Sequence, residues 1–224
     1  MTAAADFADT DPADEPRPPG ARASRPKDAA TLILIRRDGG DPRVLMGRRH
    51  GGHAFMPGKW VFPGGRVERS DARAPAATEL RPEVRARLEL RTRAADVRAL
   101  GIAAIRETAE EAGLHLARET ATGPLPDLAA LTFVARAVTP AYHPKRFDAR
   151  FFTADAGALL SLEREASSGE LDEIGWLTLG EARAADLPAI TRFVLAEVER
   201  RLDASDGPAP FVRTLRGARD LQWL

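Results

Sequence analysis

Apolar and polar positions along the chain predict strands and helices in mixed order. The apolar run at residues 29–36 has the length of one strand. Gly and Pro residues at 37–43 indicate a hairpin turn, which makes 44–48 the partner strand. Further short apolar segments of strand length lie at residues 60–62, 131–138, 147–153 and 174–177.

Three segments have a composition or spacing typical of helices. Residues 99–112 are rich in Ala, and Gly113 stands where a left-handed cap is expected. Residues 188–202 carry apolar side chains near helical spacing, and 82–91 begins with a Pro that suits a first helical turn. This order of elements predicts a mixed sheet with helices packed on it, an α/β or α+β sandwich.

The chain length of 224 residues suits one domain with tails. Residues 1–28 are dominated by Ala, Asp, Pro and Gly and are predicted to be a disordered tail. The folded domain is expected at 29–205, followed by a C-terminal extension, 206–224, without a predicted element. Within the domain, the polar segment 66–96 is interpreted as an insert. Three roles stay open for it: a lid or wall over a site, a contact between the subunits of a dimer, or a surface excursion without a role.

Composition excludes several classes of function. The chain has no Cys, which excludes a disulfide scaffold, a Cys nucleophile and a thiolate metal site. Its 33 Lys and Arg balance 33 Asp and Glu, which argues against a nucleic acid partner held by bulk charge. No apolar run approaches the roughly 18 residues that span a membrane. We expect a cytoplasmic protein, since the N-terminus has no basic-then-apolar signal pattern.

Three carboxylates share one face of the predicted helix. Glu107, Glu110 and Glu111 stand at i, i+3 and i+4, where like charges repel one another. A divalent cation such as Mg²⁺ or Mn²⁺ reverses that repulsion and prefers oxygen ligands. A solvated acidic face is the commoner arrangement for such a triplet alone. The Gly64–Gly65 turn upstream favours a metal site, because glycine backbone can approach a ligand closely.

The segments RETAEEAGL (106–114) and FPGG (62–65) resemble the Nudix hydrolase signature, G-x5-E-x7-R-E-U-x-E-E-x-G-U, where U is a bulky aliphatic residue. Thr108 replaces the first aliphatic residue, and 27 additional residues separate the two halves. Counting back from Arg106 places the first signature Glu at Arg98. Such an interrupted signature, together with KRFDARFF (145–152), is similar to the branch that includes the peroxisomal coenzyme A diphosphohydrolase.

The resemblance implies an α/β Nudix fold, in which a mixed β-sheet lies between α-helices (α/β/α). It also implies a metal-dependent diphosphatase that uses water and Mg²⁺ or Mn²⁺ to cleave a nucleoside diphosphate linked to another moiety. The residues implied as catalytic or metal-binding are Glu107, Glu110 and Glu111, a backbone carbonyl of Gly64 or Gly65, and Arg106 as a brace. The general base stays open between a Glu of the signature and a loop acid, Glu170 or Glu173.

The implied partner is a small nucleotide substrate, with coenzyme A or acyl-CoA first and ADP-ribose, NADH or nucleotide sugars next. An inactive nucleotide-binding module is the alternative. The coenzyme A motif of the family places an Arg at Arg49 but a second at Ala54, so one basic anchor is absent. Candidate substrate contacts are Arg48, Arg49, Lys145 and Arg146 for phosphate and Phe55 for stacking. A homodimer is compatible with the resemblance.

Overall fold

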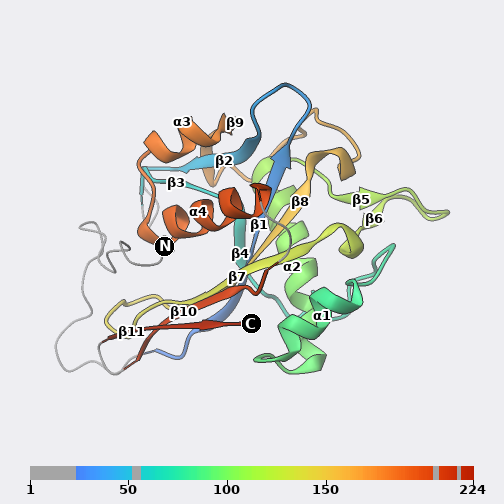
Figure 1. Ribbon diagram of the computed structural model, residues 1–224. Helices are drawn as coiled ribbons and strands as arrows, with labels where there is room; N and C mark the ends of the chain where they lie inside the picture. Colours follow the sequence, from blue (N-terminus) through green and yellow to red (C-terminus); the bar gives the residue numbers. More distant parts are fainter. Residues whose placement is uncertain (1–23, 52–56, 204–206, 216–217) are drawn as a thin grey trace.

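The computed structural model in Figure 1 describes residues 24–51, 57–203, 207–215 and 218–224. One mixed sheet of nine strands runs in the order β11-β10-β7-β8-β1-β2-β3, and β4 pairs with β1 and β9 with β2. Its strands are β1 (Lys27–Arg36), β2 (Arg43–Arg49), β3 (Trp60–Val61), β4 (Gly64–Arg66), β7 (Thr132–Val138), β8 (Phe147–Asp155), β9 (Leu171–Thr178), β10 (Pro210–Leu215) and β11 (Ala218–Trp223). The helices are α1 (Pro82–Glu89), α2 (Ala94–Ala112), α3 (Leu179–Ala184) and α4 (Ala189–Asp203), and β5 (Ala117–Arg118) with β6 (Leu125–Pro126) form a small separate ribbon.

Strand β1 lies at the centre of the sheet and separates two apolar cores. Because successive side chains of a strand point to opposite faces, Leu32 and Leu34 join the core under α2, whereas Ile33 joins the core under α4. β1 pairs parallel with β8 and antiparallel with β2 and β4. The expected mixed sheet between layers of helices is therefore confirmed (Figure 1).

The central helix α2 matches the prediction at its end and not at its start. It ends at Gly113, whose φ of 65° is the left-handed cap that was expected. It begins at Ala94, five residues before the predicted start, and so takes in the end of the predicted insert. Thr108, which replaces an aliphatic residue, is fully buried and donates its hydroxyl to the carbonyl of Ala104 at 2.8 Å. That bond makes a hydroxyl tolerable at an apolar position.

The first strand extends into the segment that was predicted to be disordered. β1 begins at Lys27, and Asp28 accepts a hydrogen bond of 2.6 Å from Arg150. Both residues pair with the start of β8, 120 positions away, so this order comes from tertiary pairing that local composition does not reveal. The predicted tail up to residue 23 lies outside the described residues.

The insert contributes a strand residue and a helix to the domain and is no inert excursion. Its first residue, Arg66, belongs to β4 in the main sheet, and α1 buries Val84 and Leu88 in the same core as Leu100. The C-terminal extension, for which no element was predicted, forms the hairpin β10–β11, and β10 pairs parallel with β7. Non-local pairing of this kind makes the extension an edge of the sheet. In the described ranges, no helix combines the length and apolarity that crossing a membrane needs.

Leu88→Ala should show that the insert helix stabilises the domain. The Leu88 side chain is 2% exposed, and shortening a buried Leu to Ala costs about 2–5 kcal/mol. Leu90, at the end of the same helix, is 62% exposed, so Leu90→Ala should change the free energy of unfolding by less than about 0.5 kcal/mol. Urea unfolding measures both variants. Equally small effects would mean that α1 is a dispensable excursion.

Candidate functional site

The C-terminal half of α2 lies directly against the glycine turn of β4. A Cβ atom on Gly65 would lie 2.4 Å from Cδ of Glu107, and one on Gly64 would lie 2.6 Å from the carbonyl oxygen of Ala30. A larger residue at position 65 would displace the Glu107 carboxylate, and one at position 64 would collide with the backbone of β1. The two glycines therefore bring the main chain into contact with the carboxylates of α2.

Glu111 is the most deeply buried carboxylate of α2. Its side chain is 3% exposed and accepts a hydrogen bond of 2.9 Å from the backbone N–H of Gly64. Burial raises the pKa of Glu111 to about 8, and repulsion from Glu107 and Glu170 acts in the same direction. Burial also raises the pKa of Glu107, although Arg106 opposes this shift. The structure thus gathers negative charge at a place where charge is costly.

Arg106 holds the acidic side chains around it in place. Its Nη1 donates to Glu107 Oε1 at 2.9 Å and to Glu110 Oε2 at 3.0 Å. Its Nε and Nη2 donate to both oxygens of Asp71, at 2.9 and 3.2 Å, and Nη2 also reaches the carbonyl of Arg66 at 2.9 Å. The guanidinium therefore links α2 to β4 and to the segment that follows it.

Asp71 is a site residue that the sequence analysis missed. It is 1% exposed, accepts a hydrogen bond from the Glu68 N–H at 2.7 Å and pairs with Arg106. Counting the signature forward from Gly65, instead of back from Arg106, places its first acid at Asp71. The additional residues therefore follow Asp71. Arg98, where the backward count placed this acid, pairs with Glu79.

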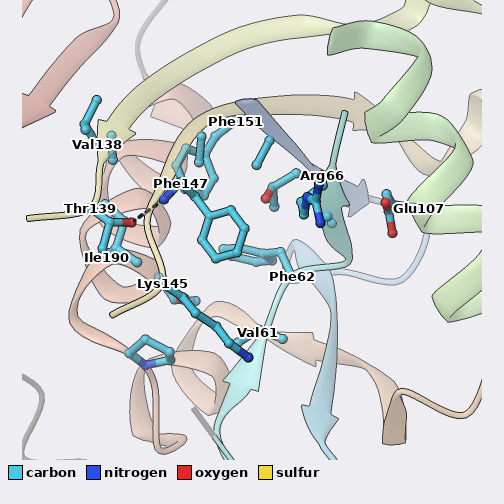
Figure 2. Close-up of a pocket in the computed structure, with 18 of the residues that line it drawn as sticks. Val61, Phe62, Arg66, Glu107, Val138, Thr139, Lys145, Phe147, Phe151 and Ile190 are labelled. Atoms are coloured by element: carbon cyan, nitrogen blue, oxygen red, sulfur yellow. Dashed lines mark hydrogen bonds between the residues drawn. The ribbon is translucent and has the colours of Figure 1, made fainter. Parts of the chain in front are cut away.

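A cavity of about 900 Å³ opens beside these acids. The glycine turn, the floor of the sheet, the 139–147 loop and the start of α4 line it. In Figure 2, Glu107 and Arg66 lie at one end, the ring of Phe62 lies in the middle, and Val138, Thr139 and Ile190 lie at the other end. The cavity thus joins an acidic end to an aromatic and aliphatic interior.

The structure brings seven of the predicted site residues to this cavity. They are Glu107, Glu111, Gly64, Gly65, Arg49, Lys145 and Glu170. Five others do not line it, and Arg106, described above, is one of them. Glu110 is 52% exposed and held by Arg106, and Arg146 donates to the carbonyls of Thr139 and Ser24 at 3.0 and 2.8 Å. Phe55 lies outside the described residues.

Arg48 and Glu173 form an ion pair with each other, away from the cavity. They are direct partners in the antiparallel pairing of β2 with β9. Because neighbouring residues of a strand face opposite ways, Arg48 and Arg49 are not expected to face the cavity together, and Arg49 is the one that lines it. The pairing of β2 with β9 was not predictable from local sequence.

The donor chemistry at the acidic end fits a hard divalent cation. Among the residues that the structure describes, no three acidic, His or Cys side chains are grouped closely enough to hold a metal ion. Glu107, Glu111 and Glu170 nevertheless line the same cavity and repel one another electrostatically. Carboxylate and backbone carbonyl oxygens are what Mg²⁺ and Mn²⁺ prefer, and Gly65 keeps the main chain free to approach.

Comparisons with known proteins agree on one family. Residues 25–198 match the family model of the NUDIX domain. A NUDIX hydrolase from Alicyclobacillus acidocaldarius is 28% identical, with a TM-score of 0.60, over 83% of this chain and 99% of that chain. The NUDIX domain of Shewanella oneidensis NrtR, complexed with ADP ribose, is 14% identical, with a TM-score of 0.51, over 80% and 90% of the two chains. No curated protein matches the chain.

Glu111→Gln should stabilise the metal-free protein as the pH rises. The folded-state pKa of about 8 exceeds the ordinary value of 4.5, so the folded state binds more protons between these values and loses stability as pH increases. A Gln keeps an acceptor for Gly64 and cannot ionise. Urea unfolding in EDTA should show little difference at pH 5 and a gain on the order of 2 kcal/mol at pH 8. An unchanged pH slope in the variant would contradict this reading.

Asp71→Asn should weaken the link between Arg106 and the sheet. Asp71 is buried and bidentate to Arg106, so the substitution should lower the free energy of unfolding by about 1–3 kcal/mol. The control is Glu79→Gln, which removes the partner of Arg98 where the carboxylate is 63% exposed. That change should cost less than about 1 kcal/mol. Equal costs in thermal or urea unfolding would show that the Asp71 pair is no more than a surface ion pair.

Proposed function

Because the chain belongs to the NUDIX family, we propose that it is a metal-dependent diphosphatase that hydrolyses a nucleoside diphosphate linked to another moiety. The contact that carries the proposal is the packing of Glu107 and Glu111 against the Gly64–Gly65 turn. This contact lies at one end of a cavity large enough for a small nucleotide. It combines a place for a cation with a place for its polyanionic substrate.

In this proposal the cation is held by Glu107, Glu110 and Glu111 of α2 and by a backbone carbonyl of Gly64 or Gly65. A bound divalent cation supplies neutralisation of the phosphate charge and activation of water. Arg106 fixes the Glu107 and Glu110 side chains, and Asp71 fixes Arg106. Side chains held in this way need little reorganisation during the reaction.

Of Glu170 and Glu173, Glu170 is the better candidate for accepting the proton of the attacking water. It lines the cavity and interacts electrostatically with Glu107 and Glu111. Glu173 is paired with Arg48 outside the cavity. A Glu of α2 remains the alternative base. Arg49 and Lys145 line the cavity as cations for the phosphate groups.

Coenzyme A or acyl-CoA leads the proposed substrates, followed by ADP-ribose, NADH and nucleotide sugars. The branch resemblance favours the first pair, and the ADP ribose bound by the NrtR domain is the reason to test the second group. The lack of an acid at Arg98 was the reason to consider a non-hydrolysing binding module. That alternative is disfavoured, because Asp71 supplies the first acid of the signature and pairs with Arg106. A cytoplasmic location and a homodimer remain predictions.

Glu107→Gln and Glu111→Gln should each lower kcat/KM at least about 100-fold, since charge stabilisation by a cation is worth several kcal/mol and each 1.4 kcal/mol is tenfold. A screen of coenzyme A, acyl-CoA, ADP-ribose and NADH with Mg²⁺ or Mn²⁺, scored by product mass, identifies the substrate. Glu173→Gln is the matched control and should stay within about twofold of the unmodified protein. Full activity of both α2 variants would refute the assignment.

A further inference from the structure

A row of residues crosses the sheet beneath the whole length of the cavity. Strand pairing places Arg66 of β4 beside Ala29, Ala29 beside Ala149, Ala149 beside Ala137, and Ala137 beside Val212 of β10. Directly paired residues share a face of a sheet, and these five all line the cavity. Three consecutive Ala side chains leave room above the strands. The floor therefore runs from β4, which adjoins Glu107, to the C-terminal hairpin.

The row gives the cavity its length and direction. Neighbouring strands are about 4.8 Å apart, so four steps from β4 to β10 span roughly 19 Å. Phe147 and Phe151 stand two residues on either side of Ala149 and also line the cavity. They bound the row as two apolar walls. The space between them suits an extended ligand that lies across the strands.

The hairpin at the far end of this row is anchored to the rest of the sheet. Arg136 of β7 lies over the ring of Phe211, 4.5 Å from its centroid, and Arg91 donates to Gln222 Oε1 at 2.9 Å. Backbone bonds of 2.8 Å join Ala209 and Leu224 in both directions. The hairpin also lies beyond residues 25–198, the segment that matches the NUDIX family model. The hairpin is therefore a fixed wall outside the part of the chain that matches the family model.

Alternation along β10 decides which of its side chains face the cavity. Arg213 donates to Asp220 at 2.7 Å and lies over the Phe211 ring, on the face that Arg136 occupies. Val212 and Thr214, one position to either side, therefore face the cavity floor that Ala137 belongs to. Arg213 also borders the cavity, but its guanidinium is held by Asp220, so Val212 and Thr214 supply the methyl groups at the hairpin end.

We propose that the C-terminal hairpin β10–β11 is the specificity wall of the substrate cavity, with Val212 and Thr214 limiting the length of the moiety attached to the diphosphate. The inference rests on the proposed function and adds the substrate's direction: the diphosphate lies at the β4 end and the variable moiety extends towards β10. Val138 and Ile190 line the same region (Figure 2). Lys145 extends towards Val61 instead. The moiety at the hairpin end therefore meets a largely aliphatic surface that Arg213 borders.

Val212→Trp tests this assignment, because a large ring there shortens the cavity without touching the acidic end. We expect kcat/KM to fall at least about tenfold for the longest substrate that the unmodified protein accepts and less than about threefold for the shortest, in the order coenzyme A, NADH, ADP-ribose. Thr214→Trp, at a less buried position, should show the same grading and serves if Val212→Trp does not fold. Leu215→Trp is the matched control, because Leu215 is exposed and does not line the cavity.

Calorimetric binding of the same compounds, with Ca²⁺ present, separates this inference from the proposed function. Losses that grow with substrate length in the Trp variants, with Leu215→Trp unaffected, support the hairpin assignment. If the Trp variants lose affinity equally for all substrates, or lose none, the hairpin assignment is overturned. Hydrolysis by the unmodified protein still upholds the proposed function in that case. If the unmodified protein hydrolyses nothing, the proposed function fails, and binding decides: length-graded loss upholds the wall, and its absence refutes it.

Discussion

The site depends on how closely the Gly65 backbone approaches the Glu107 carboxylate. With 2.4 Å between Glu107 Cδ and the position a Cβ would take, any larger residue at position 65 would displace the Glu107 carboxylate. Gly64 adds the N–H that binds Glu111. One end of the cavity therefore has its carboxylates set by main-chain contact, which is more rigid than contact between flexible side chains.

Burying these carboxylates close together destabilises the fold, and the Arg106 guanidinium offsets part of that destabilisation. Buried carboxylates that repel one another destabilise a fold unless they are paired or bind a cation. Arg106, on the same helix, neutralises part of that charge, and the buried Asp71 orients it. Asp71 precedes the added segment in the sequence and Arg106 follows it. Their ion pair therefore brings the two halves of the signature together in space. The helix α1 within the insert then contributes to the core.

Local sequence was enough to predict what neighbouring residues determine. The Ala-rich α2, its Gly113 cap and the shared face of its carboxylates follow from helical spacing and glycine geometry. Features set by pairing between distant strands were not predictable. They are the Arg48–Glu173 ion pair, the inclusion of Lys27 and Asp28 in β1, and the whole β10–β11 hairpin. Asp71 could have been predicted from the sequence, because counting the signature forward from Gly65 reaches it. Nothing in its local sequence, however, distinguishes it from the other acidic residues of this polar segment.

The most direct test of the account is Mn²⁺ binding to a variant that keeps every ligand side chain. Gly65→Ala adds one methyl group where the structure leaves no space, whereas Gly39→Ala adds it where no atom lies within 4 Å. Electron paramagnetic resonance titration of free Mn²⁺ measures the affinity of each variant. The account predicts that Gly65→Ala weakens Mn²⁺ binding at least about tenfold and that Gly39→Ala binds like the unmodified protein. Unchanged Mn²⁺ affinity in Gly65→Ala would contradict a cation site at the glycine turn.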